Sequence, residues 1–247
     1  MKRIFAAVLL AALLLSVSGC GREGDDRMTT EPTRPPETTA PEPIPLSELF
    51  PPFEQPGNLL LAGGGTLRVS LLSAESGRSY RIRYPSGSEA TVGWDAIAPL
   101  VPSVPDLPAP SGAQTLAFLK TELGDPLPDF VIFVDLTRLT VSVVTDGGVV
   151  AVFPCSAGDA GHPTPRGVYV VDYKTEYLGK EGFYLCRWGV HYFGGYLLHS
   201  VLYTWTGDEI LDGELSARIS HGCVRLSPEA SRWLYDVAPI GATVLVN

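Results

Sequence analysis

The stretch Ser220-His221-Gly222-Cys223, near the end of the chain, combines residue types that can perform covalent catalysis. A cysteine thiolate is a strong nucleophile, and an imidazole within hydrogen-bond reach can accept the thiol proton. Ser227-Pro228-Glu229 follows shortly afterwards and is typical of a helix start, so we expect the helix dipole to lower the pKa of the Cys223 thiol. Gly222 would let the backbone turn tightly, and the amides of Gly222 and Cys223 could stabilise an oxyanion. A buried structural cysteine at a strand-to-helix turn is the alternative interpretation.

The surrounding motifs favour catalysis. His199 precedes Ser220-His221-Gly222-Cys223 by a spacer, and Val224 and Arg225 follow directly. Upstream, the segment 153–158 is followed by Pro163-Thr164-Pro165-Arg166-Gly167. This order resembles the signature of the L,D-transpeptidase catalytic domain family, which has an upstream His, [S/T]HGC, an apolar residue, and Asn or Arg. The second pair of segments is similar to the family's "TG…TPxG" stretch, and the resemblance covers about residues 130–246.

The resemblance implies a role for each site residue. Cys223 would be the nucleophile, His199 its general base, and Ser200 would orient the imidazole through its backbone carbonyl. The remaining site residues would bind the oxyanion and the substrate: Ser220, His221, Gly222 and Arg225. The implied reaction forms 3→3 cross-links between peptidoglycan peptide stems through an acyl-enzyme, with release of D-Ala from a tetrapeptide, and needs no cofactor and no metal. The alternatives are an L,D-carboxypeptidase acting at the same site and a non-catalytic wall-binding lipoprotein.

The chain departs from the family pattern between His199 and Ser220. Twenty residues lie between these two positions, several more than the commonest family spacer. We interpret the extra material as a loop that forms a lid over the substrate. His221 is a weaker candidate for the base than His199, because neighbours in sequence need not face each other. His162 lies in a Gly/Pro-rich loop that we expect at the surface, and His191 is expected to be a packed residue.

The N-terminal segment that ends at Cys20, one of the four cysteines, indicates an extracytoplasmic protein. Val17-Ser18-Gly19-Cys20 ends an apolar run, Phe5 to Leu15, and resembles the lipobox of bacterial lipoproteins. An ordinary signal peptide or a short membrane anchor is the alternative. If Cys20 carries lipid, three cysteines remain, and Cys155 and Cys186 either form a disulfide or are two buried thiols. We therefore expect a monomer that is lipid-anchored to the membrane and acts in the cell envelope.

Composition divides the chain into five parts. Residues 1–20 are the predicted signal peptide and lipobox, and 21–57 a disordered Pro/Thr-rich tether. Residues 58–100 read as short strands similar to a small bacterial SH3-like domain, 101–127 as a linker and helix, and 128–247 as the catalytic domain. The predicted fold class is mainly β, with an L,D-transpeptidase-like β-sandwich or mixed sheet and a few short helices. The net charge of −9 and the lack of a basic stripe argue against a nucleic-acid partner.

Overall fold

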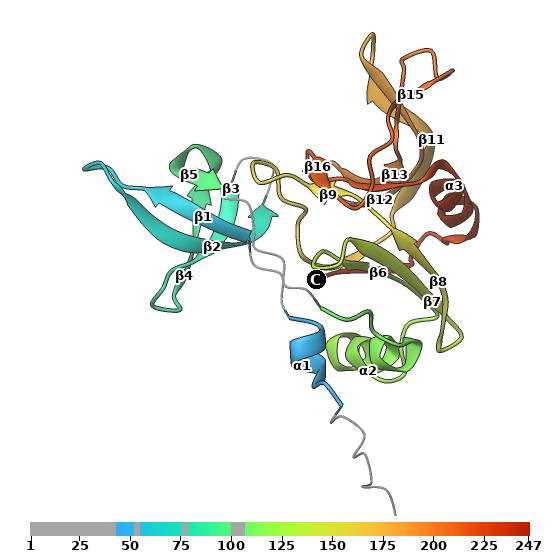
Figure 1. Cartoon of the computed structure of the whole chain (residues 1–247), viewed down its shortest axis with the longest axis horizontal. Coiled ribbons are helices and arrows are strands. Elements are labelled where there is room, and N and C mark those ends of the chain that lie inside the picture. Colours follow the sequence, from blue (N-terminus) through green and yellow to red (C-terminus); the bar gives the residue numbers. More distant parts are fainter. Residues whose placement is uncertain (1–42, 52–54, 76–78, 100–106) are drawn as a thin grey trace, which may run out of the picture. The chain divides into compact units, whose positions relative to one another are not determined.

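The computed structural model describes residues 43–51, 55–75, 79–99 and 107–247 (Figure 1). The predicted signal peptide, Cys20 and most of the predicted tether lie outside these residues. Strands account for 48% of the described residues and helices for 15%, so the mainly β fold class is confirmed. Among the described residues, no helix has the length and apolar character needed to cross a membrane.

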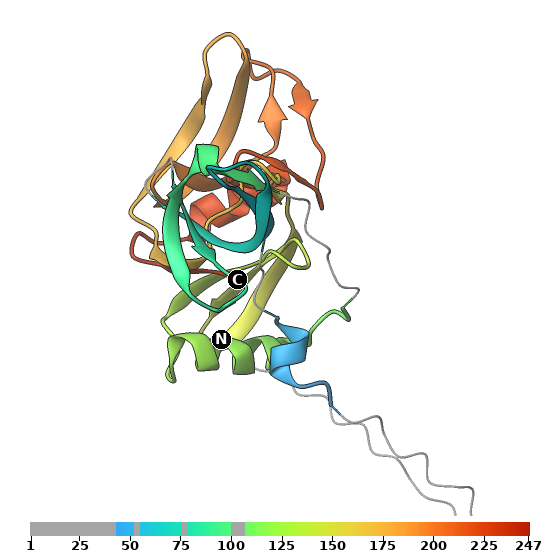
Figure 2. The same cartoon turned by 90° about the vertical axis from the view of Figure 1, so that its left-hand side faces the viewer.

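The first sheet lies where the sequence predicts a small β domain. Its strands are β1 (Gln55–Leu60), β2 (Thr66–Glu75), β3 (Ser79–Arg83), β4 (Glu89–Gly93) and β5 (Ile97–Pro99), in the order β4-β3-β2-β1-β5. The register is antiparallel throughout, and a 3-10 turn (Trp94–Ala96) leads into β5 (Figure 2). Alternate residues of β3, Tyr80 and Ile82, point into a separate small core. The likeness of this sheet to an SH3 domain stays a prediction.

The second sheet lies at the centre of the part that the sequence predicts to be catalytic, residues 128–247, which is called the catalytic part below. Its order is β10 (Gly167–Val170), β18 (Thr243–Val246), β6 (Phe130–Asp135), β7 (Thr140–Thr145) and β8 (Gly148–Pro154), and β18 runs parallel to β6. Alternation along β6 sends Ile132 and Val134 into one core and Val131 and Phe133 into another, so the strand is buried on both faces. The predicted hairpin between β7 and β8 turns at Asp146 and Gly147, which both have positive φ.

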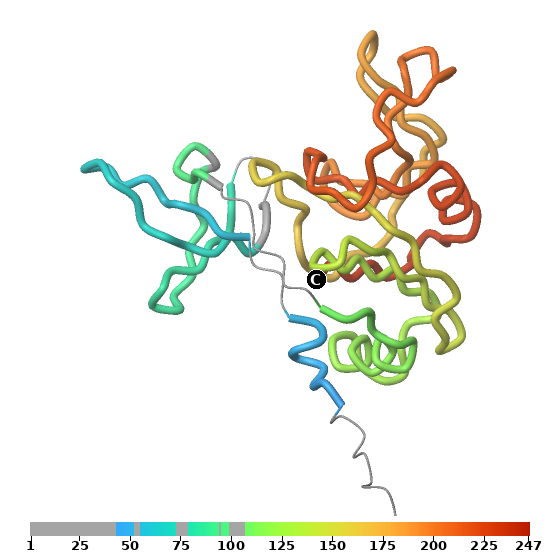
Figure 3. Tube along the Cα trace, viewed as in Figure 1, coloured from blue at the N-terminus to red at the C-terminus, as the bar shows by residue number. Residues whose placement is uncertain are grey.

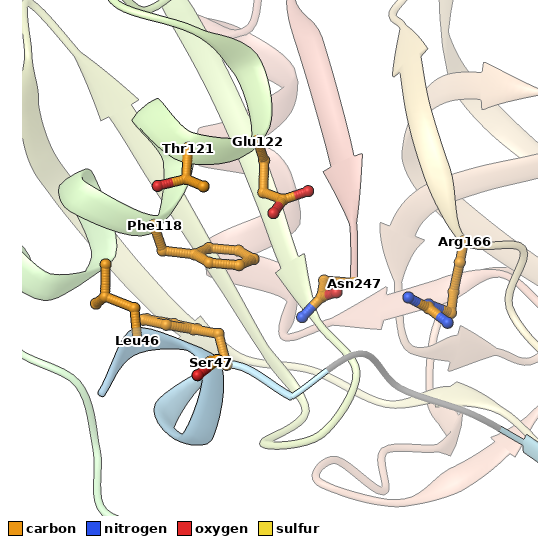
Figure 4. A pocket seen from close by; sticks show the side chains of 8 residues that line it. Leu46, Ser47, Phe118, Thr121, Glu122, Arg166 and Asn247 are labelled. Atoms are coloured by element: carbon orange, nitrogen blue, oxygen red, sulfur yellow. The ribbon is translucent and has the colours of Figure 1, made fainter. Parts of the chain in front are cut away.

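Two helices cover one face of this second sheet (Figure 1). Helix α2 (Gly112–Leu123) begins at the predicted Ser111 cap, which forms a full capping box with Gln114. Helix α1 (Leu46–Leu49) is short, but the following Phe50 stacks on Phe118 of α2 with ring centroids 4.4 Å apart. A shallow pocket of about 340 Å³ lies beside them, bordered by Leu46, Phe118 and the C-terminal Asn247 (Figure 4).

Helix α1 corrects the predicted extent of the tether. The predicted tether covers residues 21–57, whereas in the structure Leu49 and Phe50 are buried and β1 begins at Gln55. Arg138 fixes the segment by donating to the Leu49 carbonyl, and the Asn247 side chain donates to the carbonyl of Pro51. Leu49 and Phe50, together with these hydrogen bonds, therefore dock the end of the predicted tether on the second sheet.

The third sheet lies over the other face of the central sheet, and the trace in Figure 3 shows its C-terminal strands above β6 to β8. It contains β15 (Ile210–Asp212), β14 (Leu202–Tyr203), β12 (Tyr184–Phe193), β13 (Tyr196–Ser200) and β17 (Val224–Leu226), with β11 (Tyr173–Lys180) paired to β12. Helix α3 (Pro228–Val237) begins at the predicted Ser227 cap and buries Ala230 and Leu234 against this sheet. A short parallel pair, β9 (Ala157–Gly158) with β16 (Arg218–Ser220), completes the fold.

Candidate active site

Two adjacent parallel strands position the predicted nucleophile and base. Strands β13 and β17 pair with His199 opposite Arg225 and Leu198 opposite Val224. Because side chains alternate along strands, Cys223 and Arg225 lie on the same face as His199. All three side chains border one pocket of about 450 Å³. The other residues that line it are Leu178, Gly179, Tyr184, Cys186, Gly195, Leu197, Leu202, Ser220 and His221.

His199 is held in one tautomer. Its ring is buried, and Nδ1 lies 2.6 Å from the backbone carbonyl of Ser200, which can only accept a hydrogen bond. Nδ1 therefore carries the proton, and Nε2 is left with a lone pair. Burial lowers the pKa of His199 to about 4; the Ser200 carbonyl opposes this shift and the nearby charge of Arg225 adds to it. The imidazole is neutral at neutral pH and available as a base.

Cys223 has a different environment from the one the sequence indicates. Strand β17 separates it from α3, so the predicted effect of the helix dipole on the thiol is wrong. Burial raises the pKa of Cys223, while the Leu197 amide and the charge of Arg225 oppose that shift. The half-buried Sγ lies 3.8 Å from the Gly195 carbonyl. The resting thiol is protonated, and the nucleophile must be formed by proton transfer.

The turn before Cys223 is fixed by Ser220 and Gly222. The Ser220 hydroxyl donates to the Cys223 carbonyl at 2.6 Å and accepts from the Gly222 amide at 3.1 Å. Gly222 has φ +105°, and a Cβ at this position would lie 2.3 Å from Tyr196 Cε1. Only glycine fits, because both the backbone conformation and the space exclude a side chain. Ser220 thus shapes the turn, and the Gly222 amide is already used within it.

Arg225 is tied to the long spacer between His199 and Ser220. Its Nη1 donates to Asp212 Oδ2 at 2.7 Å, and its backbone exchanges hydrogen bonds with Ser156. Burial opposes ionisation of Asp212, but the Glu214 amide and the Arg225 guanidinium together hold its pKa below the ordinary value. Asp212 could not be identified from the sequence, because its partner is thirteen residues away and their contact depends on sheet pairing.

The spacer itself is not the simple loop that we predicted. Residues 200–219 contain β14, β15 and most of β16, and β14 pairs with both β12 and β15. Leu202 from this segment lines the pocket. Its three short strands are hard to see in the sequence because each is only two or three residues long. A role as a lid stays a prediction.

The remaining cysteines are free thiols, so the disulfide considered between Cys155 and Cys186 is not formed. Cys155 lies in the main core, whereas Cys186 on β12 borders the pocket. Burial raises the pKa of Cys186 to about 12, and that of Cys155 is raised further. Neither thiol is a competing nucleophile in the resting protein.

The histidines outside the pair lie where the sequence placed them. His191 is buried, with Nδ1 2.5 Å from Asp172 and Nε2 2.6 Å from the Gly194 carbonyl, and is a packed residue. His221 is exposed at the rim of the pocket. His162 is also exposed, and its ring meets that of His221 edge to face with centroids 4.4 Å apart.

Comparison with known proteins points to one family. Residues 129–246 match the family model described as YkuD, L,D-transpeptidase catalytic domain. A curated relative, L,D-transpeptidase 1 of Mycobacterium tuberculosis, is 28% identical over 136 residues, which cover 51% of this chain and 52% of the relative. The chain thus spans about half the length of the curated relatives that it matches.

Solved structures also resemble parts of the chain. A fused Zn-dependent amidase/peptidase/peptidoglycan-binding domain-containing protein from Clostridium acetobutylicum is 25% identical, with a TM-score of 0.45 over 55% of this chain and 59% of that one. An L,D-transpeptidase from Mycobacterium tuberculosis is 28% identical, with a TM-score of 0.40 over 49% of this chain and 58% of that one. The family match and the ordered motifs coincide on the same residues. The segment 129–246 of this chain belongs to the L,D-transpeptidase catalytic domain family.

Proposed function

We propose that the chain is an L,D-transpeptidase that forms 3→3 cross-links between peptidoglycan stems through an acyl-enzyme on Cys223. The observation that best supports the proposal is the common face of β13 and β17, where His199 and Cys223 border one pocket. The fixed tautomer of His199 adds to it, since Nε2 is the nitrogen that remains able to accept a proton.

In the first half-reaction, the thiol proton passes to His199 Nε2 while Sγ attacks the carbonyl carbon that precedes the terminal D-Ala of a tetrapeptide stem. Because thiol and imidazole are both neutral at rest, proton transfer accompanies attack, and the charge of Arg225 stabilises the developing thiolate. The C–N bond then breaks, His199 returns the proton to the departing D-Ala amine, and a thioester remains.

The backbone donor that we assign to the oxyanion is the Cys223 amide. The Gly222 amide donates to the Ser220 hydroxyl and is committed to the turn. The turn orients the amide of the next residue, because the Ser220 hydroxyl bonds to both the Gly222 amide and the Cys223 carbonyl. Preorganised amides of this kind contribute a large share of acyl-transfer catalysis, about 3 kcal/mol for one donor.

In the second half-reaction, an amine from a neighbouring stem attacks the thioester carbonyl. His199 accepts the amine proton, the C–S bond breaks, and the thiol is restored as the new amide forms. If water takes the place of the amine, the product is a free tripeptide, which is the carboxypeptidase alternative.

The test is incubation of the purified chain with disaccharide-tetrapeptide, followed by mass spectrometry of the stem peptides. Cross-linked dimers with loss of one D-Ala are expected from the wild type and from neither Cys223→Ala nor His199→Ala. Tripeptide without dimer would replace the proposal by the carboxypeptidase. Unchanged dimer formation by Cys223→Ala would show that the nucleophile is wrongly assigned.

The same proposal places the enzyme on a membrane surface through lipid on Cys20. It is supported by the lipobox-like sequence Val17-Ser18-Gly19-Cys20 alone. The expressed chain should partition into detergent, and Cys20→Ala should move it to the aqueous phase. Retention of Cys20→Ala in the detergent phase would favour the uncleaved apolar segment as the anchor.

A further inference from the structure

Three potential metal ligands meet at the rim of the active-site pocket. Asp159, His162 and His221 each offer one ligand atom, and these atoms all lie within 4.8 Å of one another. The first two come from the loop after β9, and His221 belongs to the turn that leads to Cys223. These three ligands could not be grouped from the sequence, because 58 residues separate His162 from His221 and no metal-ligand spacing is visible.

The backbone holds the three positions together. Strands β9 and β16 pair in parallel with Gly158 opposite Ser220, so the next residues on each strand, Asp159 and His221, are neighbours. The Asp159 amide donates to the Ser220 carbonyl at 2.8 Å, which continues the pairing by one step. The ligand-bearing loop is thus attached directly to the turn of the catalytic cysteine.

The loop is also tightly folded. A Cβ on Gly158 would lie 2.1 Å from the His162 carbonyl and 2.6 Å from the Thr164 amide, so the chain closes back over this glycine. The Gly158 amide donates to the Thr164 hydroxyl, and the His162 amide donates to Asp159 Oδ1 at 2.7 Å. His162 and Asp159 are therefore fixed in place by the backbone while their side chains stay accessible.

We propose that Asp159, His162 and His221 form a Zn²⁺ site at the rim of the Cys223 pocket. Two imidazoles and one carboxylate suit zinc, whereas Mg²⁺ and Ca²⁺ prefer oxygen ligands alone. In tetrahedral zinc the donors lie about 3.4 Å apart, given metal–ligand distances near 2.1 Å. His162 Nδ1 and Asp159 Oδ1 are 3.0 Å apart, so exposed side chains need to move little. Three protein ligands leave the fourth position open to water or to an anionic group.

The site would connect metal occupancy to the catalytic pocket. His221 borders that pocket, so a bound ion would restrain its ring and add positive charge at the rim. The thiol itself is a zinc ligand by its chemistry, so any test must separate the two sites.

The experiment uses the purified chain in the Cys223→Ala form, stripped with chelator and titrated with ZnCl₂ against a chromophoric chelator. One Zn²⁺ per chain is expected, and X-ray absorption at the zinc edge should report nitrogen and oxygen ligands without sulfur. His162→Ala and Asp159→Asn should each weaken binding by at least about 100-fold, the upper end of the loss caused by disturbing even a supporting residue.

Asp208→Asn is the matched control, because Asp208 is an exposed carboxylate outside the cluster. It should bind zinc as the parent does, and thermal unfolding of each variant confirms that its fold is retained. Absence of binding in the Cys223→Ala form, or affinity for Asp159→Asn within threefold of Asp208→Asn, overturns the proposal. No turnover is measured, so the outcome is independent of the transpeptidase assignment.

Discussion

The Cys223–His199 pair rests in its neutral form. Burial lowers the pKa of the imidazole and raises that of the thiol, and both shifts oppose a preformed thiolate–imidazolium pair. The charge of Arg225 acts in the other direction on the thiol. In the proposed mechanism, such a site protects the thiol from adventitious reaction and makes attack depend on a bound substrate that excludes water.

The neutral His199 makes folding stability depend on pH. Its pKa is about 4 in the folded chain and 6.5 ordinarily, so the unfolded chain binds this proton first. The contribution of the neutral imidazole to the free energy of unfolding is therefore fully present above pH 6.5. As the pH falls towards 4 this contribution is lost, and the total loss is roughly 3 kcal/mol. Urea unfolding at pH 7 and 4.5 should show about 2 kcal/mol more loss for the wild type than for His199→Asn. Equal losses would contradict the burial of a neutral imidazole.

Ser200 allows its backbone role to be separated from its side chain. The carbonyl orients His199, whereas the hydroxyl accepts from the Arg187 amide and donates to the Val201 carbonyl. Ser200→Ala keeps the carbonyl, so turnover should stay within about threefold of the wild type. Stability should fall by about 1–3 kcal/mol because buried polar groups lose partners. A large loss of activity at unchanged stability would assign the hydroxyl to the chemistry.

Site residues could be identified from the sequence where they belong to a local motif. An ordered signature indicated that Cys223 and His199 would share one site, and they border one pocket, with the Ser200 carbonyl bonded to the imidazole. Asp212 and Asp159 were not predictable, because each meets its partner only after strands distant in sequence have paired. The predicted thiolate failed for a related reason, since three residues of strand separate Cys223 from the helix start.

At the scale of elements, the site depends on the parallel pairing of β13 with β17. Parallel strands need a crossover connection, and here the chain between them holds the long spacer and β16. The turn before β17 must then be narrow, because Tyr196 at the start of β13 lies directly against it. Helices and hairpins with strong caps and turns were predictable, as Ser111, Ser227 and Asp146-Gly147 show. Strands of two or three residues were not, since so short a run has no measurable period.

Gly222 is the element-scale position with the least tolerance. Gly222→Ala puts a Cβ 2.3 Å from Tyr196 Cε1 at a φ of +105°, so the turn must distort. We expect a cost of about 1–3 kcal/mol and a loss of most of the alkylation rate of Cys223. Gly63→Ala, at an exposed turn of the first sheet with open space, is the control and should change neither quantity. Similar behaviour of the two variants in urea unfolding and iodoacetamide kinetics would count against the geometry of this turn.

At the scale of the whole molecule, the first sheet is inserted between two segments that both belong to the catalytic part. Leu49 and Phe50 precede it, α2 follows it, and all of them share one core with the central sheet. The core of the first sheet is separate. Composition could not reveal this arrangement, because the apolar residues of segment 43–51 do not by themselves indicate which sheet they pack on.

Removal of the first sheet from the chain tests whether the catalytic part is stable without it. Replacing residues 52–106 with a flexible linker of about 20 residues should lower the melting temperature of the catalytic part only slightly. Neither of its core clusters includes a residue from this range, and the Tyr80 hydroxyl that donates to the Gly161 carbonyl contributes only about 1 kcal/mol. Phe50→Ala in the intact chain should instead cost about 3–4 kcal/mol. A catalytic part that unfolds after excision but tolerates Phe50→Ala would show that the inserted sheet, and not the docked segment, supports it.

The docking of residues 43–51 also settles how far the enzyme can work from the lipid that we propose on Cys20. The path from Cys20 to the docked segment is residues 21–42, which at most extends by about 3.5 Å per residue, or roughly 75 Å. The first sheet follows the docked segment in the chain. Its size therefore does not change the length of chain between Cys20 and residue 43. Enlarging or deleting it would leave the working radius above the bilayer unchanged, whereas every residue removed from 21–42 would shorten it.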